Sequence, residues 1–330
     1  MPPPPIMSKL FIQPRYESPR YLFLQGCSNN YGWFYRSYLP DLETTQPVGV
    51  TLKISDPSNN YISEDFNPGY IYVKSPLAYV GNYQSGDIAV IDPLTGEIKW
   101  RFSIGPNPAS VALARTATKL LVSHLGSGTV SILDTATREL LHTVSVAGLN
   151  PQGIAVTPDD KIALVAMADS TSISAIDLKG LWWYGYPPPQ ATSIDIGGQS
   201  MHIAITSDGK SAYITNIKAD GTRALSVVDI ATKTLVEDIV LPRYVNDAET
   251  IPAEVALHYD DTRAYVTSWP GVVFVVDRQT RTVTKTIFVG GQPQGITFAP
   301  GKAYVACSRE DVVSVIDTTT DTFLKNIFLP

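Results

Sequence analysis

The sequence predicts an all-β protein folded as a β-propeller, and two observations support this fold class. First, six segments of the 330-residue chain end in an apolar pair followed by aspartate, at spacings of 42, 43, 52, 48 and 40 residues. Second, each repeat contains four short stretches with the composition of β-strands. A period near 45 residues with four strands is about the length of one propeller blade. The six aspartates are Asp92, Asp134, Asp177, Asp229, Asp277 and Asp317.

The strands of one repeat follow each other in a fixed order. GIAVT at 153–157 is short, apolar and rich in small residues, and a Pro-Asp-Asp turn follows it. KIALVAM at 161–167 and ISAID at 173–177 have the β-branched and apolar content of buried strands. Threonines after the aspartate, as in TAT at 135–137, favour a turn because their hydroxyls bond nearby backbone. ELLHTVSV at 139–146 then alternates polar and apolar residues, as a half-exposed outer strand does.

Residues 1–68 depart from the repeat but contain four strand-like pieces. We expect these pieces to form one divergent four-stranded blade. Together with the six repeats over residues 69–330, it predicts a seven-bladed ring in a single domain spanning residues 1–330. A six-bladed ring with an N-terminal extension is the alternative. The four pieces are residues 9–13, 20–26, 32–39 and 48–54.

Composition limits the classes of partner. With 44% hydrophobic and 17% charged residues, the chain can bury a large core. A net charge of -6 and the absence of Lys or Arg runs predict that nucleic acid is not a partner. The N-terminus has no signal-peptide pattern, and no stretch of eighteen apolar residues occurs, so we expect a cytoplasmic protein without a membrane partner. Cys27 and Cys307 are too few for a disulfide framework and lack metal-ligand spacing.

The repeats resemble those of the YVTN-type β-propeller family. The resemblance rests on SAYITN at 211–216, RAYVTS at 263–268, the Pro-Gln-Gly triplets at 151 and 293, and the Val-Ile-Asp repeat ends. It covers residues 69–330 and implies the propeller fold. The family includes surface-layer modules, lactonase-like and lyase-like enzymes, and dehydrogenase subunits, so the resemblance implies no single function.

Alignment of the repeats on their innermost strands brings five residues into one column. Three are small, which suits strands crowded around the axis. The other two are His202 and Glu254, in adjacent repeats, and they depart from this rule. An imidazole beside a carboxylate is suited to acid/base catalysis or to binding a divalent metal, and a mutual hydrogen bond that plugs the ring is the structural alternative. The column consists of Ser110, Gly153, His202, Glu254 and Gly295.

The resemblance implies that the loop entering each innermost strand and the loop after each second strand open on one face of the channel. His124 is therefore a further catalytic candidate, and six residues are candidates for binding substrate. Asn216, like Asn82, also suits a plain turn residue. The repeated Pro-Gln-Gly triplet gives its glutamines a structural alternative. The substrate-binding candidates are Gln152, Asp169, Asn216, Trp269, Gln294 and Arg309.

Two functional classes follow. The first is a small-molecule enzyme of lyase, cyclase or lactone-hydrolase type at the channel mouth, with no cofactor beyond a possible divalent metal. The second is a non-catalytic binding or scaffold protein that holds a protein or glycan with two insertions, residues 179–190 and 242–252. The first insertion carries Trp182, Trp183, Tyr184 and Tyr186. The sequence lacks nucleotide-binding, zinc-protease, Cys-x-x-Cys and serine-hydrolase motifs.

Overall fold

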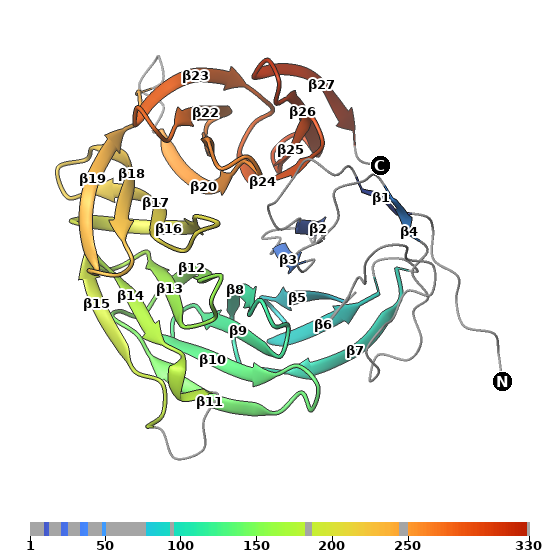
Figure 1. Cartoon of the computed structure of the whole chain (residues 1–330), viewed down its shortest axis with the longest axis vertical. Helices are drawn as coiled ribbons and strands as arrows, with labels where there is room; N and C mark the ends of the chain where they lie inside the picture. The colour runs from blue at the N-terminus through green and yellow to red at the C-terminus, as the bar shows by residue number, and fades with distance from the viewer. Residues whose placement is uncertain are drawn as a thin grey trace.

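Six antiparallel β-sheets stand around a central axis as the blades of a propeller (Figure 1). The computed structural model describes residues 77–92, 96–181, 187–243 and 250–328, together with the backbone of four N-terminal strands. In these residues the regular structure is β-strand, apart from one 3-10 turn, η1 (Lys179–Leu181). The propeller fold predicted from the repeat is confirmed.

Blades follow one another in chain order, and so do the strands within each blade. Blade 1 comprises β5 (Ala78–Asn82), β6 (Asp87–Ile91) and β7 (Ile98–Ser103). Blade 2 comprises β8 (Pro108–Leu113), β9 (Lys119–His124), β10 (Thr129–Asp134) and β11 (Leu140–Ser145). Blade 3 comprises β12 (Pro151–Val156), β13 (Ile162–Met167), β14 (Ser172–Asp177) and β15 (Ala191–Asp195).

The last three blades are also four-stranded. Blade 4 comprises β16 (Gly198–Ile205), β17 (Ser211–Lys218), β18 (Arg223–Asp229) and β19 (Thr234–Val240). Blade 5 comprises β20 (Ile251–Leu257), β21 (Arg263–Trp269), β22 (Val272–Asp277) and β23 (Thr282–Phe288). Blade 6 comprises β24 (Pro293–Ala299), β25 (Lys302–Cys307), β26 (Val312–Asp317) and β27 (Thr322–Phe328).

The hydrophobic core lies between neighbouring blades. Leu164 and Ile173 of blade 3, for example, form one buried cluster with Ile203 and Ile214 of blade 4. The β-branched side chains of the second and third strands fill these interfaces, since both faces of a blade are covered. The innermost strands lie side by side around the axis, with β12 between β8 and β16.

The turn after the repeated aspartate is held by the aspartate side chain. Asp229 Oδ1 accepts hydrogen bonds from the backbone N–H and the hydroxyl of Thr232, at 2.8 and 2.9 Å. Asp277 makes the same two bonds to Thr280. The backbone and hydroxyl donors of Thr232 lower the pKa of Asp229. The predicted turn chemistry of the Asp and Thr residues is confirmed.

The prediction of seven blades is wrong, because the described residues form six. The four N-terminal pieces are strands, β1 (Leu10–Ile12), β2 (Tyr21–Gln25), β3 (Phe34–Tyr38) and β4 (Val48–Val50). They pair as β1 with β4 and β2 with β3, in two separate two-stranded sheets rather than one blade. Strand content predicted a blade, whereas the register of pairing decides whether one forms.

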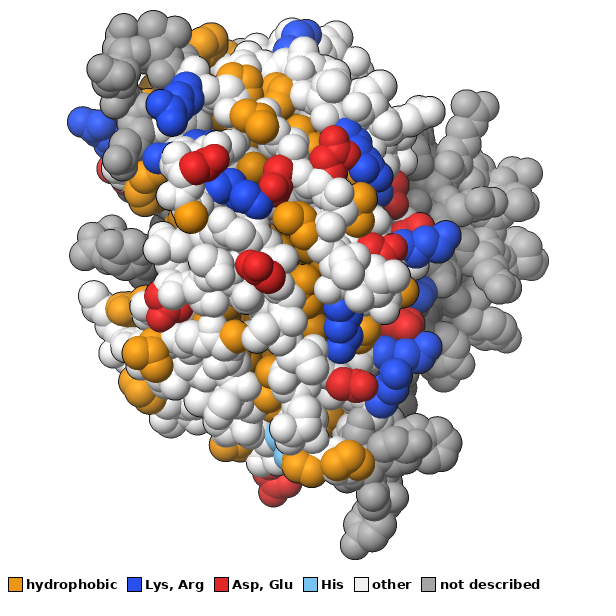
Figure 2. Space-filling view, turned by 90° about the vertical axis from the view of Figure 1, so that its left-hand side faces the viewer, with side chains coloured by type: hydrophobic (Ala, Val, Ile, Leu, Met, Phe, Trp, Pro, Cys, Tyr) orange, Lys and Arg blue, Asp and Glu red, His pale blue; other side chains and the backbone are white. Residues whose placement is uncertain are grey.

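The outer rim near β15 and β19 carries both signs of charge, with hydrophobic side chains scattered between them (Figure 2). Over the described part of this face no broad area of one sign is seen. Such a surface does not favour a phosphate backbone there, and the exclusion of nucleic acid stays a prediction. Within the residues described, no helix has the length and apolar character needed to cross a membrane.

Candidate functional site

A β-bulge places the column residues of the innermost strands. In the innermost strands of blades 2 to 6, the pairing with the second strand shifts at this position, for example between Ser200 and Ile203. At a bulge the extra residue leaves the ladder, so its backbone needs another partner. The N–H of His202 donates to Thr215 Oγ1 at 2.9 Å, and the N–H of Glu254 donates to Thr267 Oγ1 at 3.0 Å.

In blade 2, Ser123 Oγ accepts the corresponding bond from the N–H of Ser110 at 3.1 Å, and these three hydroxyls also connect neighbouring blades. Ser123 Oγ donates to the carbonyl of Gln152 at 2.7 Å, and Thr267 Oγ1 donates to the carbonyl of Gln294 at 3.3 Å. Thr215 Oγ1 lies 3.4 Å from the carbonyl of Ala253. The bulges of blades 2, 4 and 5 are therefore fixed both within their own blade and against the next one. Rigid support of this kind is what a catalytic or binding group needs.

The structure brings His202 and Glu254 together. His202 Nε2 lies 3.8 Å from Glu254 Oε1, and the two side chains are 26% and 13% exposed. This separation is within ion-pair range and longer than a hydrogen bond. The prediction that adjacent innermost strands place the two residues as neighbours is confirmed.

Gly153 makes room for His202. A Cβ at Gly153 would lie 2.8 Å from His202 Cα and 2.9 Å from the carbonyl oxygen of Met201. Both atoms belong to backbone, which cannot move aside as a flexible side chain would. The small residue in this blade is thus required by the close approach of β16.

His202 and Glu254 line a cavity of about 550 Å³ inside the ring. Its walls come from the innermost strands and from the turns that follow them, mainly through Val, Ile and Leu side chains. The volume is in the range of small-molecule sites. Among the described residues, the polar groups that join the pair in the lining are Ser110, Arg115, Thr157, Thr297 and Tyr304.

Sequence reasoning missed Arg115, Thr297 and Tyr304. Arg115 lies in the turn after β8, Thr297 lies in β24, and Tyr304 lies in β25. Thr297 Oγ1 is buried and makes no hydrogen bond. The sequence held one signal, because Thr297 is polar where aligned innermost strands have alanine, as at Ala155.

Residues 63–252 match the YNCE-like beta-propeller family, which is more than half of the chain. The protein belongs to this family. The YVTN-type repeats from which the sequence resemblance was drawn are related to it. No curated protein matches the chain.

Solved structures share the fold of this YNCE-like propeller. The Kuenenia stuttgartiensis hydrazine synthase matches with a TM-score of 0.66 and 18% identity, over 77% of this chain and 84% of that chain. The β-propeller domain of Cps50 (Swd1) from Myceliophteria thermophila matches with a TM-score of 0.62 and 11% identity, over 77% and 83%. At these identities the likeness is one of fold.

His124 is a buried structural residue of the YNCE-like propeller and does not line the cavity. It is 3% exposed, and its Nδ1 lies 3.0 Å from the carbonyl oxygen of Pro106. Its Nε2 lies 2.9 Å from Ser131 Oγ. Burial lowers the pKa of His124, against the opposing effect of the Pro106 carbonyl. Both ring nitrogens are thus engaged in holding blade 2 together.

Asn216 fills the corresponding place in blade 4. Its Nδ2 donates to the carbonyl of Ile196 and to Ser226 Oγ, both at 2.9 Å. The pattern matches that of His124, which also bonds one loop carbonyl and one serine of the third strand. The turn interpretation of Asn216 is therefore close to its structural role, and the residue is not part of the cavity lining.

The remaining candidates lie away from the cavity lining. Asp169 is exposed and accepts hydrogen bonds from the N–H groups of Leu149 and Asn150, at 2.8 and 3.1 Å. Its carboxylate therefore orders the loop that enters β12. Gln152 and Gln294 accept hydrogen bonds from Ser123 and Thr267 through their backbone carbonyls, as described above. Trp269 ends β21 and is half-buried, and Arg309 is exposed in the turn after β25.

Among the described residues, His202 and Glu254 are too few ligands for a catalytic metal ion. His202 and Glu254 supply two donors, whereas protein sites for catalytic metals supply about three. Within the described residues, no group of three His, Cys, Asp or Glu side chains is placed to hold an ion. The two donors in the described part of the chain do not make up a metal site, so the chemistry below uses the two side chains alone.

Proposed function

We propose that the protein is a small-molecule enzyme whose substrate binds in the central cavity beside His202 and Glu254. One observation carries the proposal: the ionisable pair of the innermost column, 3.8 Å apart, lines a cavity of about 550 Å³. Ionisable groups converging on a mostly apolar cavity are the usual mark of a binding or active site.

In this proposal His202 transfers the proton and Glu254 assists it. The imidazole accepts a proton from the substrate or from a water and later returns it to the leaving group. The Glu254 carboxylate orients the ring and stabilises the imidazolium that forms. In the half-buried site their attraction is stronger than it would be in water.

Lyase, cyclase and lactone-hydrolase reactions share this proton transfer. In lactone hydrolysis, His202 takes a proton from water while the water oxygen bonds to the carbonyl carbon. The ring C–O bond then breaks, and the proton returns to the departing alkoxide oxygen. In a lyase, the same base removes a proton next to a carbonyl group as a leaving group departs.

Turnover of a lactone panel, followed by acid release in a pH-stat, tests the proposal. We expect the wild type to hydrolyse at least one member, with a loss of about 100-fold or more in His202→Ala. Glu254→Gln should show a smaller loss. His142→Ala and Glu139→Gln, on and beside the outer strand β11, are the matched controls and should keep full activity. Equal rates in all five proteins would contradict the assignment.

A non-catalytic binding protein is the second candidate, and a specific surface supports it. The outer strand β27 exposes four large apolar side chains within seven residues: Phe323, Leu324, Ile327 and Phe328. The corresponding strand β23 buries Ile287. Exposed apolar groups that gather on one element are typical of protein contact sites. Of the two insertions proposed for this role, residues 182–186 and 244–249 lie outside the described residues, and with them Trp182, Trp183, Tyr184 and Tyr186.

A further inference from the structure

We propose that blade 6 carries a docking face for the N-terminal segment of the same chain, residues 1–68, which packs in the sector between blade 6 and blade 1. We call this surface the outward face of blade 6. It is independent of the proposed enzymatic function, because it includes neither member of the ionisable pair. Its residues are Tyr304 on β25, Val313 on β26, and Lys325 and Ile327 on β27.

Hydrophobic clusters fill five of the junctions around the ring. Each cluster joins two consecutive blades, from blades 1 and 2 to blades 5 and 6. The innermost strand β24 packs against β20 of blade 5, but no comparable packing joins it to blade 1 in the described part of the chain. The outward face of blade 6 therefore lacks the neighbour that the matching face of each other blade has.

The apolar residues of this face correspond to residues that are buried in blade 5. Ile287 on β23 is 5% exposed and Val273 on β22 is fully buried, and both belong to the cluster shared with blade 6. Their counterparts in the same register are Ile327, which is 40% exposed, and Val313, which is half-buried. Exposed apolar side chains at positions that are otherwise buried mark a contact surface.

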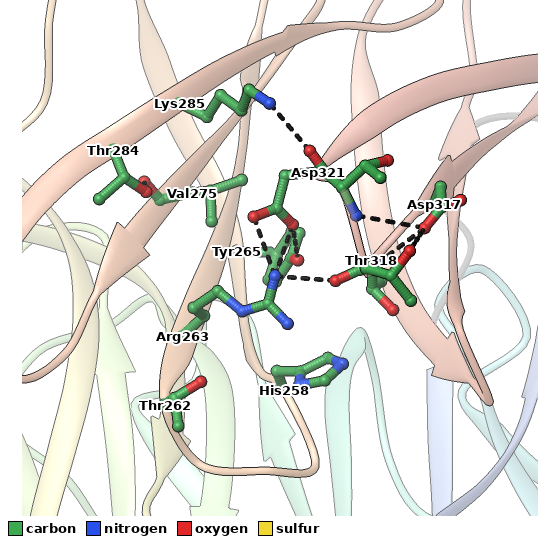
Figure 3. Close-up of polar contacts among 12 residues, drawn as sticks. His258, Thr262, Arg263, Tyr265, Val275, Thr284, Lys285, Asp317, Thr318 and Asp321 are labelled. Carbon is green, nitrogen blue, oxygen red and sulfur yellow. Dashed lines mark hydrogen bonds and ion pairs between the residues drawn. The ribbon is translucent and has the colours of Figure 1, made fainter.

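Lys325 occupies a position from which other outer strands bond to the next blade. Glu237 on β19 pairs with Arg281, in the turn between β22 and β23, at 2.6 Å. Lys285 on β23 donates to the carbonyl of Thr320, in the turn between β26 and β27, at 2.8 Å (Figure 3). The three outer-strand residues share one register with the third strand. Among the described residues Lys325 has no such partner.

Tyr304 shows the same difference from blade 5. Its counterpart in register, Tyr265, is fully buried and donates its hydroxyl to Asp321 of blade 6. Tyr304 is half-buried, and its hydroxyl bonds to none of the residues that the structure describes. The occupant of the outward face therefore supplies hydrogen-bond acceptors as well as apolar side chains.

Residues 1–68 are the segment in place to cover this face. They exceed the 40 to 52 residues of one repeat, and apolar and aromatic residues make up most of β1, β2, β3 and β4. Figure 1 shows these strands in the sector between blade 6 and blade 1, and β3 contacts β5 and β8 at the blade 1 side. Because it belongs to the same chain, this segment has a high effective concentration at the face.

Limited trypsin digestion of the full chain tests the inference. We expect slow cleavage within residues 1–68 of the wild type, and cleavage about tenfold or more faster in Ile327→Asp, because the charge opposes docking. Phe328→Asp is the matched control, since Phe328 is 77% exposed and pairs with Val312 on the blade 5 side. Equal cleavage rates in all three proteins would overturn the inference. The trypsin sites are Lys9, Arg15, Arg20, Arg36 and Lys53.

Photo-cross-linking identifies the occupant without relying on a destabilised variant. p-Benzoylphenylalanine replaces Ile327 in one purified protein and Val240, which is 61% exposed at the end of β19, in the control. We expect position 327 to cross-link to a peptide from residues 1–68 of the same molecule, and position 240 to form no such link. A cross-link from position 327 to a second copy of the chain, or no cross-link there, would overturn the inference.

Discussion

Single residues account for the departures from the repeat pattern. The sequence predicted His202 and Glu254 as neighbours because both occupy a column that otherwise holds small residues, and the structure places them 3.8 Å apart. It could not separate these residues from His124, whose burial against Pro106 and Ser131 depends on packing between strands. Nor does the sequence show that the Thr297 hydroxyl lacks a partner, since this depends on every neighbouring atom.

Gly153→Ala tests the close approach between β12 and β16. The new Cβ would meet backbone atoms of His202 and Met201 below 3.0 Å, so the strands must separate. We expect a loss of about 1–3 kcal/mol in the free energy of unfolding, the usual range for overpacking. Gly81→Ala is the matched control, because its nearest neighbour lies at 3.4 Å. Denaturant unfolding of both variants measures the difference, and equal losses would contradict the steric account.

His124→Asn tests whether His124 is structural. Asparagine already fills the corresponding place at Asn216 with the same two kinds of partner, so the variant should fold with a stability change of about 1 kcal/mol or less. It should also keep any lactone turnover. Loss of turnover in a folded His124→Asn protein would restore the catalytic role that the sequence suggested.

The same substitution changes the pH dependence of stability. Burial holds the pKa of His124 below 6.5, and burial does the same to His258 despite the nearby Asp260 carboxylate. The unfolded chain therefore binds these protons more readily than the folded protein does. The free energy of unfolding should be highest above about pH 6.5 and fall as the pH drops through that value. His124→Asn should flatten this fall in unfolding curves at pH 7.5 and 5.0, and an unchanged slope would contradict it.

At the scale of elements, hydrogen bonds and ion pairs between side chains hold neighbouring blades together. Arg263 on β21 donates to both carboxylate oxygens of Asp321, at 2.8 and 2.9 Å, and to the carbonyl of Thr318 at 2.8 Å (Figure 3). Tyr265 donates its hydroxyl to the same carboxylate. Burial and this bond raise the pKa of Tyr265, so the phenol stays protonated. These bonds of Arg263 and Tyr265 join blade 5 to the turn between β26 and β27.

Asp321→Asn should weaken this contact between Arg263 and residue 321. The substitution keeps a residue that tolerates the positive φ of 53° but removes the charge that Arg263 faces. We expect a loss of about 2 kcal/mol in the free energy of unfolding, below the value for a fully buried pair because both side chains are partly exposed. Asp311→Asn, in an exposed turn with φ of 51°, is the matched control. Equal stability of the two variants in denaturant would contradict the stabilising role of the pair formed by Arg263 and Asp321.

Local patterns predicted the strands well, because alternation and turn residues act over a few positions. Residues 153–157 lie within two residues of the ends of β12, and residues 173–177 lie within one residue of the ends of β14. The Asp and Thr turns also follow from local hydrogen bonds. The pairing of β1 with β4 could not be predicted in this way, because it depends on contacts between residues about forty positions apart.

At the scale of the whole molecule, the repeat period determines the ring but not its number of blades. Six units over residues 69–330 were apparent from the aspartates, and the described sheets correspond to them. The predicted seventh blade depended on how the strands of residues 1–68 pair with one another, and that prediction was wrong. The cavity also belongs to this scale, because its lining comes from strands separated by the full length of the repeats.

A double-mutant cycle on turnover tests most directly the central claim that His202 and Glu254 act together in this cavity. The measurement compares kcat/KM of the wild type, His202→Ala, Glu254→Gln and the double variant. If the carboxylate acts through the imidazole, the double variant should lose no more activity than His202→Ala alone. Losses that multiply, or single variants as active as the wild type, would contradict it.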